Sequence, residues 1–188
     1  MKRFIPLAAL IVIAPFVVPR TAEGQGYTFT VNGLLGFGGS IDKTDPGFGN
    51  LNWQLGFSNT IERRTHFGIR VGGLGFGSTD QLGDLTNADL TYITLAGEYR
   101  ERAAAGSGRF LESGVFVGLG YFQLKGDSLL DGERISDGSL GLVVGVTGDL
   151  PLNRRRNLAL RIEIQGQFAD LDAASLFAMA QAGLSYRF

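Results

Sequence analysis

The stretch LFAMAQAGLSYRF, from Leu176 to the carboxyl-terminal Phe188, alternates between two kinds of side chain. Every second residue from Leu176 is leucine, alanine, tyrosine or phenylalanine, whereas the intervening positions include Gln181, Ser185 and Arg187. A period of two predicts a β-strand that buries only one face. Because no later element follows Phe188 in this sequence to cover the aromatic face, we expect lipid to cover it.

Seven earlier segments alternate in the same way, and each is bounded by clusters of glycine, aspartate or asparagine. Each has roughly the 9–11 residues that a tilted strand needs to cross the hydrocarbon layer of a membrane. We therefore predict an all-β fold, an eight-stranded antiparallel up-and-down transmembrane β-barrel. Its strands are expected at Tyr27–Gly39, Asn50–Ile61, Thr65–Phe76, Leu90–Arg100, Phe110–Leu124, Leu140–Leu150, Asn157–Phe168 and Leu176–Phe188.

Residues 1–24 are predicted to be a cleaved signal peptide. Two basic residues precede an apolar run from Phe4 to Val18, and small residues follow at Ala22 and Gly24. The run is about 15 residues long and contains two prolines, whereas a membrane-spanning helix needs roughly 20 residues. We expect cleavage after Gly24, which leaves residues 25–188 as one barrel domain. The alternative is an uncleaved membrane anchor.

Composition excludes several classes of function. The chain has no cysteine, so neither disulfides nor thiolate metal sites are available to it. Without residues 1–24 the chain has 14 basic and 17 acidic residues, a net charge of about −3. This balance gives no electrostatic basis for nucleic-acid binding. We also expect no cofactor.

The predicted connections fall into a long and a short group. The long ones are 40–49, 77–89, 125–139 and 169–174, and the short ones are 62–64, 101–108 and 151–156. Ten of the eleven aspartates fall in the long group. The short group instead holds a set of arginines, namely Arg63, Arg64, Arg102, Arg154, Arg155 and Arg156. This sorting by sign indicates that the two groups lie on opposite sides of a membrane.

A soluble barrel such as a lipocalin also alternates, but it places its apolar residues inside around a ligand. Here the polar face carries charges, and a charge at mid-depth on a lipid-facing barrel surface costs about 2–4 kcal/mol. Aromatic residues also lie towards the predicted strand ends, which is typical of the girdles of membrane barrels. These residues are Tyr27, Phe37, Trp53, Tyr99, Tyr121, Phe168, Tyr186 and Phe188. We therefore favour the membrane barrel.

The last eight residues, QAGLSYRF, place a polar residue, a glycine, a hydrophobic residue and a terminal aromatic at Gln181, Gly183, Tyr186 and Phe188. This order resembles the carboxy-terminal β-signal of bacterial outer-membrane proteins. The chain as a whole resembles the small OmpA/OmpX-type members of the porin-like outer-membrane β-barrel family. The resemblance implies insertion by the barrel-assembly machinery, which reads the β-signal. It does not extend to the peptidoglycan-binding domain that follows the barrel in OmpA.

Within this resemblance, we expect both termini and the arginine-rich turns in the periplasm and the acidic loops outside. The barrel is expected to be a monomer in contact with outer-membrane lipid and lipopolysaccharide. Its role is expected to be structural or one of surface interaction. The connections 40–49, 77–89 and 125–139 are the predicted contact surface.

Charged residues on the polar faces are predicted to meet inside the barrel. They are Arg70, Glu98, Glu112, Arg161, Glu163 and Arg187. Eight strands leave an interior that side chains just fill, so general porin activity is not expected. One hypothesis is a narrow charge-gated channel for ions or small solutes. The other is a static set of ion pairs that plugs the lumen, which we favour because buried charges need partners in either case.

An enzyme that modifies outer-membrane lipid is a third alternative, since His66, the only histidine, could serve as a base. His66 follows the arginine-rich turn at Arg63, on the side opposite the lipid A leaflet, and has no serine partner nearby in sequence. We therefore predict that the protein is not an enzyme.

Aspartate pairs in the long connections have the oxygen ligands that Ca²⁺ or Mg²⁺ prefer. None has the full spacing of a calcium-binding loop, so we predict no metal site and interpret them as solvated surface acids. The pairs are Asp42 with Asp45, Asp127 with Asp131, and Asp170 with Asp172.

Overall fold

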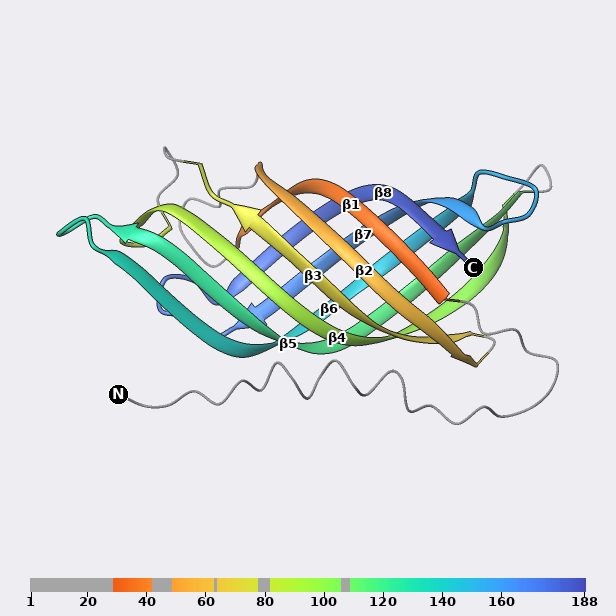
Figure 1. Ribbon diagram of the computed structural model, residues 1–188, viewed down its shortest axis with the longest axis horizontal. Coiled ribbons are helices and arrows are strands. Elements are labelled where there is room, and N and C mark those ends of the chain that lie inside the picture. The colour runs from red at the N-terminus through yellow and green to blue at the C-terminus, as the bar shows by residue number, and fades with distance from the viewer. Residues whose placement is uncertain (1–28, 42–48, 63, 78–81, 106–108) are drawn as a thin grey trace.

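In the computed structural model of the protein, eight antiparallel strands close into one barrel in sequence order, and β1 pairs with β8 (Figure 1). The structure describes residues 29–41, 49–62, 64–77, 82–105 and 109–188. The predicted fold class is therefore confirmed. The strands are β1 (Phe29–Ser40), β2 (Asn50–Glu62), β3 (Thr65–Gly75), β4 (Leu85–Ala105), β5 (Arg109–Ser128), β6 (Arg134–Pro151), β7 (Leu158–Ala169) and β8 (Leu176–Arg187).

The predicted signal peptide and Tyr27 lie outside the described residues. In the part of the chain that the structure does describe, no helix is long and apolar enough to cross a membrane.

Strands β4, β5 and β6 are several residues longer than predicted. The expected connections 77–89, 101–108 and 125–139 are wrong, because β4 extends from Leu85 to Ala105 and only residues 129–133 separate β5 from β6. The polar residues of these stretches join the ladder, with Asp89 opposite Lys125 and Asp127 opposite Arg134. Cross-strand pairing thus overrides the local preference of aspartate and glycine for loops. Strands β4 to β6 therefore project at one end, here called the loop end, and the opposite end is called the turn end (Figure 1).

A tight connection joins the neighbouring long strands β5 and β6. Gly132 adopts a positive φ of 71°, which glycine tolerates without strain, and its N–H donates to the Ser128 carbonyl at 2.9 Å. The Asp131 carboxylate accepts a hydrogen bond from the Glu133 N–H at 3.1 Å. These contacts close the hairpin, and its tip lies at the left of Figure 1.

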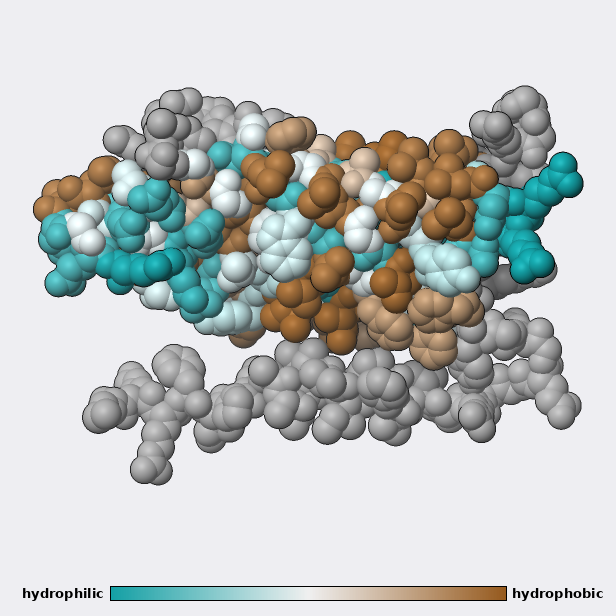
Figure 2. Space-filling model, turned by 45° about the horizontal axis from the view of Figure 1, so that its top comes forward, coloured by the Kyte–Doolittle hydropathy of each residue, from teal (hydrophilic) through white to brown (hydrophobic). Residues whose placement is uncertain are grey.

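The predicted alternation sets which side chains face out. Large apolar side chains cover the outside of every strand, and Leu35, Leu119 and Leu140 are 65%, 66% and 73% exposed. Figure 2 shows these hydrophobic residues over the middle of the barrel, with hydrophilic residues mainly at its ends. A contiguous apolar surface of this extent is unfavourable in water, so it marks a surface that contacts lipid or another apolar partner.

The inward faces change character along the barrel. At the loop end the interior is filled by buried apolar side chains, here called the apolar cap, whereas charged side chains fill the middle. The turn 82–85 and the connection 170–175 both contribute buried side chains to the cap. The cap consists of Leu74, Phe76, Leu82, Leu85, Ala88, Leu90, Tyr92, Phe122, Leu124, Ala169, Leu171, Ala174, Phe177 and Met179.

The seam between β1 and β8 depends on close backbone approach. A Cβ atom at Gly183 would lie 2.0 Å from the Gly33 carbonyl oxygen, and one at Gly36 would lie 2.0 Å from the Ala180 carbonyl oxygen. These contacts are with backbone, which cannot swing away as a flexible side chain can. Gly183 therefore has a steric role at the closing seam in addition to its predicted place in the β-signal.

We predict that Gly183→Ala lowers the free energy of unfolding by about 1–3 kcal/mol, because the added methyl group forces β8 away from β1. The measurement is urea unfolding in lipid vesicles, followed by the emission of the single tryptophan.

The matched control is Gly33→Ala in the same seam, where a Cβ would meet only the Leu55 side chain at 3.6 Å. We expect it to change stability by less than about 0.5 kcal/mol. Equal effects of the two substitutions would contradict this account of the seam.

Candidate functional site

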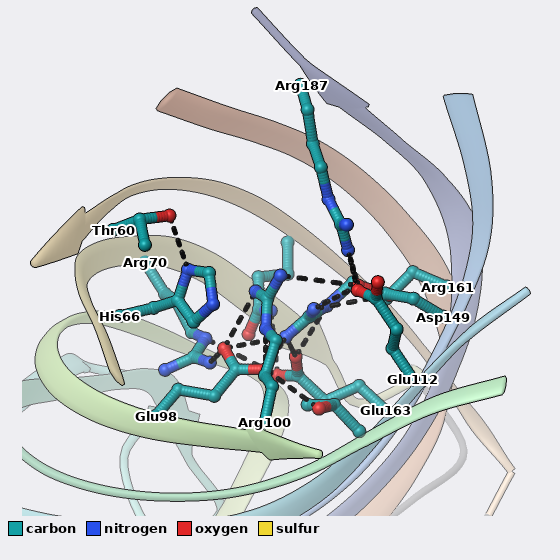
Figure 3. A network of polar contacts seen from close by, with 12 residues as sticks. Thr60, His66, Arg70, Glu98, Arg100, Glu112, Asp149, Arg161, Glu163 and Arg187 are labelled. Carbon is teal, nitrogen blue, oxygen red and sulfur yellow. Dashed lines mark hydrogen bonds and ion pairs between the residues drawn. The ribbon is translucent and has the colours of Figure 1, made fainter. Parts of the chain in front are cut away.

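The middle of the barrel holds a network of charged side chains from β3 to β8 (Figure 3). Each member lies on an inward-facing position of its strand, because side chains of a β-strand alternate between its two faces. The network contains the arginines Arg70, Arg100, Arg161 and Arg187 and the acids Glu98, Glu112, Asp149 and Glu163.

Arg161 of β7 is the centre of this network and is 0% exposed. Its Nη2 atom lies 3.0 Å from Glu98 Oε1 and 3.1 Å from Glu163 Oε2. Its Nη1 atom lies 3.3 Å from both carboxylate oxygens of Asp149. The planar guanidinium thus joins three carboxylates from three strands, a geometry that the point charge of lysine could not reproduce.

Glu98 of β4 is the carboxylate shared by the most partners. Arg100 Nε donates to Glu98 Oε1 at 2.8 Å, and Arg70 Nη2 donates to Oε2 at 3.1 Å. The Thr147 hydroxyl also donates to Oε1, at 2.8 Å. Both carboxylate oxygens are therefore hydrogen-bonded, as a buried charge requires.

One cation–π contact and two ion pairs complete the network at its margins. The guanidinium carbon of Arg70 lies 3.9 Å from the centre of the Phe116 ring, a cation–π contact that supplements its ion pairs. On the other side, Arg187 of β8 contacts Glu112 at 2.5 Å and Asp149 at 3.0 Å. These two ion pairs link β8, the last strand, to β5 and β6.

The network is balanced in charge, with four arginines facing four carboxylates. Breaking a buried pair is costly, because the partner that remains is an uncompensated charge in a medium of low dielectric constant. The arrangement is therefore a mutually dependent set, in which each side chain fixes the positions of its neighbours.

All six charged residues predicted to face the interior lie in this network, and the structure adds Arg100 and Asp149. Arg100 lies two residues after Glu98 on β4, so the same alternation places it on the inward face. Asp149 shares the inward alternation of Thr147 on β6, so the sequence contained a signal for it. What periodicity could not supply is the register that brings Asp149 opposite Arg161.

A layer of amides separates the network from the apolar cap. Gln54 Nε2 donates to Glu163 Oε1 at 2.9 Å, and the Tyr92 hydroxyl donates to Gln54 Oε1 at 3.1 Å. Gln165 Nε2 lies 3.1 Å from the same Gln54 oxygen. The interior thus passes from ion pairs through neutral hydrogen bonds to hydrocarbon without an abrupt change in polarity.

His66 lies at the turn end, beside the network. The Thr60 hydroxyl oxygen is 3.0 Å from His66 Nδ1, and His66 faces Glu98 across the β3–β4 ladder. The imidazole is mostly buried and lies inside the barrel, away from the outward surface where a lipid substrate would be. This position suits a packed interior histidine better than the base of a lipid-modifying enzyme.

The predicted girdle aromatics that the structure describes all point outward, with exposures between 43% and 61%. They are Phe37, Trp53, Tyr121 and Phe168 towards the loop end and Tyr99, Tyr186 and Phe188 towards the turn end. The Tyr99 hydroxyl accepts a hydrogen bond from Arg64 in the β2–β3 turn, which raises the pKa of that guanidinium.

The four positions of the predicted β-signal lie on β8 and directly after it. The Gln181 side chain is buried inside the barrel, whereas Tyr186 and Phe188 pack on each other on the outer face, with ring centres 5.7 Å apart. Phe188 also pairs with Phe29 of β1 through two backbone hydrogen bonds of 3.0 and 3.1 Å. The last residue of the chain therefore forms part of the closing seam.

The predicted absence of a metal site stays a prediction, since Asp42 and Asp45 lie outside the described residues. Within the described ranges, no group of three or more histidine, aspartate or glutamate side chains is placed to hold a metal ion. Asp137, one of the acids placed in a loop from the sequence, instead lies on β6 and accepts a hydrogen bond from the Asp172 N–H at 2.8 Å.

Comparison with solved structures identifies the class of fold. Neisserial surface protein A is similar with a TM-score of 0.65 at 13% sequence identity, over 88% of this chain and 100% of that chain. The N-terminal β-barrel domain of Pseudomonas aeruginosa OprF gives 0.59 at 12% identity, over 88% and 100% of the two chains. Ail, the attachment invasion locus protein of Yersinia pestis, gives 0.55 at 15% identity, over 86% and 97%.

The chain therefore has the fold of the small eight-stranded outer-membrane barrels, as its last strand predicts. No family model matches the sequence. No curated protein matches it either.

The network generates a stability prediction. We expect Arg161→Met to lower the free energy of unfolding by about 3–5 kcal/mol, because it leaves three carboxylates without their shared cation. Urea unfolding in lipid vesicles measures this change.

The control is Arg64→Ala, which removes a surface pair of 3.2 Å whose side chains are 59% and 61% exposed. We expect a loss of no more than about 1 kcal/mol, because solvent screens that pair. A loss at Arg161 as small as that at Arg64 would show that the interior charges are not mutually dependent.

Proposed function

We propose that the protein is an outer-membrane barrel with a closed lumen that presents an open sheet edge to partners outside the cell. The observation that carries the surface role is the unpaired part of β6. This strand pairs with β5 from Arg134 onward but with β7 only from Gly141 onward. In the described part of the chain, residues 134–140 therefore form a projecting sheet edge, here called the open edge.

Backbone hydrogen bonds indicate which groups point to the open edge. Ser128 N–H donates to the Glu133 carbonyl on the β5 side, and Leu152 N–H donates to the Leu158 carbonyl on the β7 side. Bonded and non-bonded positions alternate along an antiparallel ladder, so the N–H groups of Ser136 and Gly138 point away from β5. Such groups can bind an extended peptide as an added strand.

The hairpin tip beside the open edge adds apolar and anionic groups. Leu129 and Leu130 are 47% and 90% exposed, well beyond the apolar belt of the barrel. The hydrogen bond from the Ser128 side chain lowers the pKa of the Asp131 carboxyl, so the tip stays anionic in mildly acidic surroundings. The structure of Ail, named as an attachment invasion locus protein, shares this fold and supports a role in attachment here.

A static interior is preferred to the channel alternative. The apolar cap fills the loop end, and the ion pairs of the network fill the middle. The cavity beside His66 and Arg70 holds about 10 Å³, roughly the space of one water molecule. Together these features support a plugged lumen that anchors the barrel and does not conduct solutes.

Biogenesis follows from the same proposal. Residues 1–24 would direct export and be removed, and the barrel-assembly machinery would read the signal at Gln181, Gly183, Tyr186 and Phe188. The barrel would then lie among outer-membrane lipid and lipopolysaccharide as a monomer, with both termini in the periplasm.

The proposed orientation can be tested by labelling, because the natural chain has no cysteine. We expect Leu130→Cys to react with a membrane-impermeant maleimide in intact cells, because the hairpin tip lies outside. The matched variant Arg155→Cys in the β6–β7 turn should react only after the outer membrane is permeabilised. If only Arg155→Cys reacts in intact cells, the orientation is the reverse of the one proposed. If neither variant reacts in intact cells, the hairpin tip is not exposed at the cell surface.

The open edge can be tested with peptides selected from a random phage-displayed library on the wild-type barrel. We expect Ser136→Pro to weaken their binding by about tenfold or more, which corresponds to about 1.4 kcal/mol, because proline removes an edge N–H and adds bulk there. Ser136→Ala, which keeps the backbone N–H, should bind normally. Selected peptides that bind all three proteins equally would show that the open edge is not the contact surface.

A further inference from the structure

A groove of about 260 Å³ crosses the outer face of the barrel near the loop end, over β2, β3, β4 and β5. Its volume lies just below the range of roughly 300–1,000 Å³ that ligand sites usually occupy. Its outward-facing lining consists of Trp53, Val71, Thr91, Ile93, Tyr121 and Gln123.

Strand register explains why the surface is hollow at this place. Trp53, Gly73, Thr91 and Gln123 are direct cross-strand neighbours in one row, and of these Thr91 is the small side chain that forms the floor of the groove. A Cβ at Gly73 would lie 2.9 Å from Trp53 Nε1, so the indole ring lies against the bare backbone at this position. Gly73 therefore leaves room for the indole ring, which forms one wall of the groove.

The other wall is also aromatic. Tyr121 leans towards β6, where a Cβ at Gly138 would lie 2.2 Å from the Tyr121 hydroxyl oxygen. The indole and the phenol thus stand on either side of a floor made by Thr91. Rings in this position offer apolar faces to a chain between them and a donor group at the edge of each ring.

The groove lies where the barrel surface changes from apolar to polar. The next row towards the turn end contains Val71, Ile93 and Tyr121, whereas the next row towards the loop end places Asp89 opposite Lys125. Gln123 Nε2 donates to the Ser136 hydroxyl at 3.1 Å on the polar side. The groove is thus continuous with the apolar belt and closes against polar groups.

We propose that this groove binds one acyl chain of a membrane lipid, with the polar end of the lipid at the level of Gln123 and Lys125. The proposal rests on the proposed membrane location, because continuity with the apolar belt is what selects a lipid as the occupant. Charge does not select the headgroup, since Asp89 and Lys125 face each other and balance. Recognition would come from the aromatic walls and the shape of the floor.

The experiment uses Trp53 as its reporter, because it is the only tryptophan in the chain. The purified barrel in non-brominated detergent micelles is titrated with phosphatidylcholine that carries brominated acyl chains, which quench indole emission at short range. We expect quenching to saturate at one lipid per barrel, far above the quenching that random mixing of lipid and detergent would give.

Two variants of the floor residue make the test specific. Thr91→Leu adds bulk to the floor and should weaken the apparent lipid affinity by about tenfold, which corresponds to about 1.4 kcal/mol. Thr91→Ser keeps the hydroxyl and leaves the groove open, so it should bind like wild type. Quenching that follows only the mole fraction of brominated lipid, or identical curves for all three proteins, would overturn the proposal.

A second arm separates this proposal from the membrane location on which it depends. In vesicles made only of brominated lipid, Trp53 of the wild type and both variants should be strongly quenched, which also shows that each variant has folded and inserted. Absence of quenching in these vesicles would overturn the membrane location and the groove together. Strong quenching there without saturable binding in micelles would overturn the groove alone.

Discussion

The pairing of β1 with β8 is the interaction on which the rest of the structure depends. It closes the sheet, so that every strand has a neighbour on both sides through the middle of the barrel. Closure at eight strands leaves an interior that only side chains can fill, which brings inward-facing residues of distant strands into contact. Arg161 and Glu98 are 63 residues apart in sequence and 3.0 Å apart in the barrel for this reason.

Periodicity alone predicts the number of strands and the inward face of the six interior charges, because a one-residue shift would move a whole apolar set to the wrong side. It failed at strand ends. Leu85 to Asp89 and Arg134 to Ser139 contain the aspartate, asparagine, glycine and serine residues that usually mark loops. Their strand conformation comes from pairing with β5, which is a property of the sheet and not of the local sequence.

The site was predictable in membership but not in geometry. Alternation predicts that a charged side chain faces the interior, whereas the strand register determines which charged side chains are neighbours. Asp149 was therefore not predicted as a member of the network, although alternation places it on the inward face of β6. The apolar cap was missed for a related reason. Phe122, Phe177 and Met179 lie on the inward faces of two different strands, and only closure of the barrel brings them together at one end.

The molecule divides by depth into an interior filled by side chains, an apolar belt and the projecting open edge. We propose that the interior is closed to ions, and conductance of the purified protein in planar lipid bilayers tests this proposal. We expect no ion current above that of the bare bilayer. Steady single-channel currents that vanish in Arg161→Ala would contradict it and establish a charge-gated channel in its place.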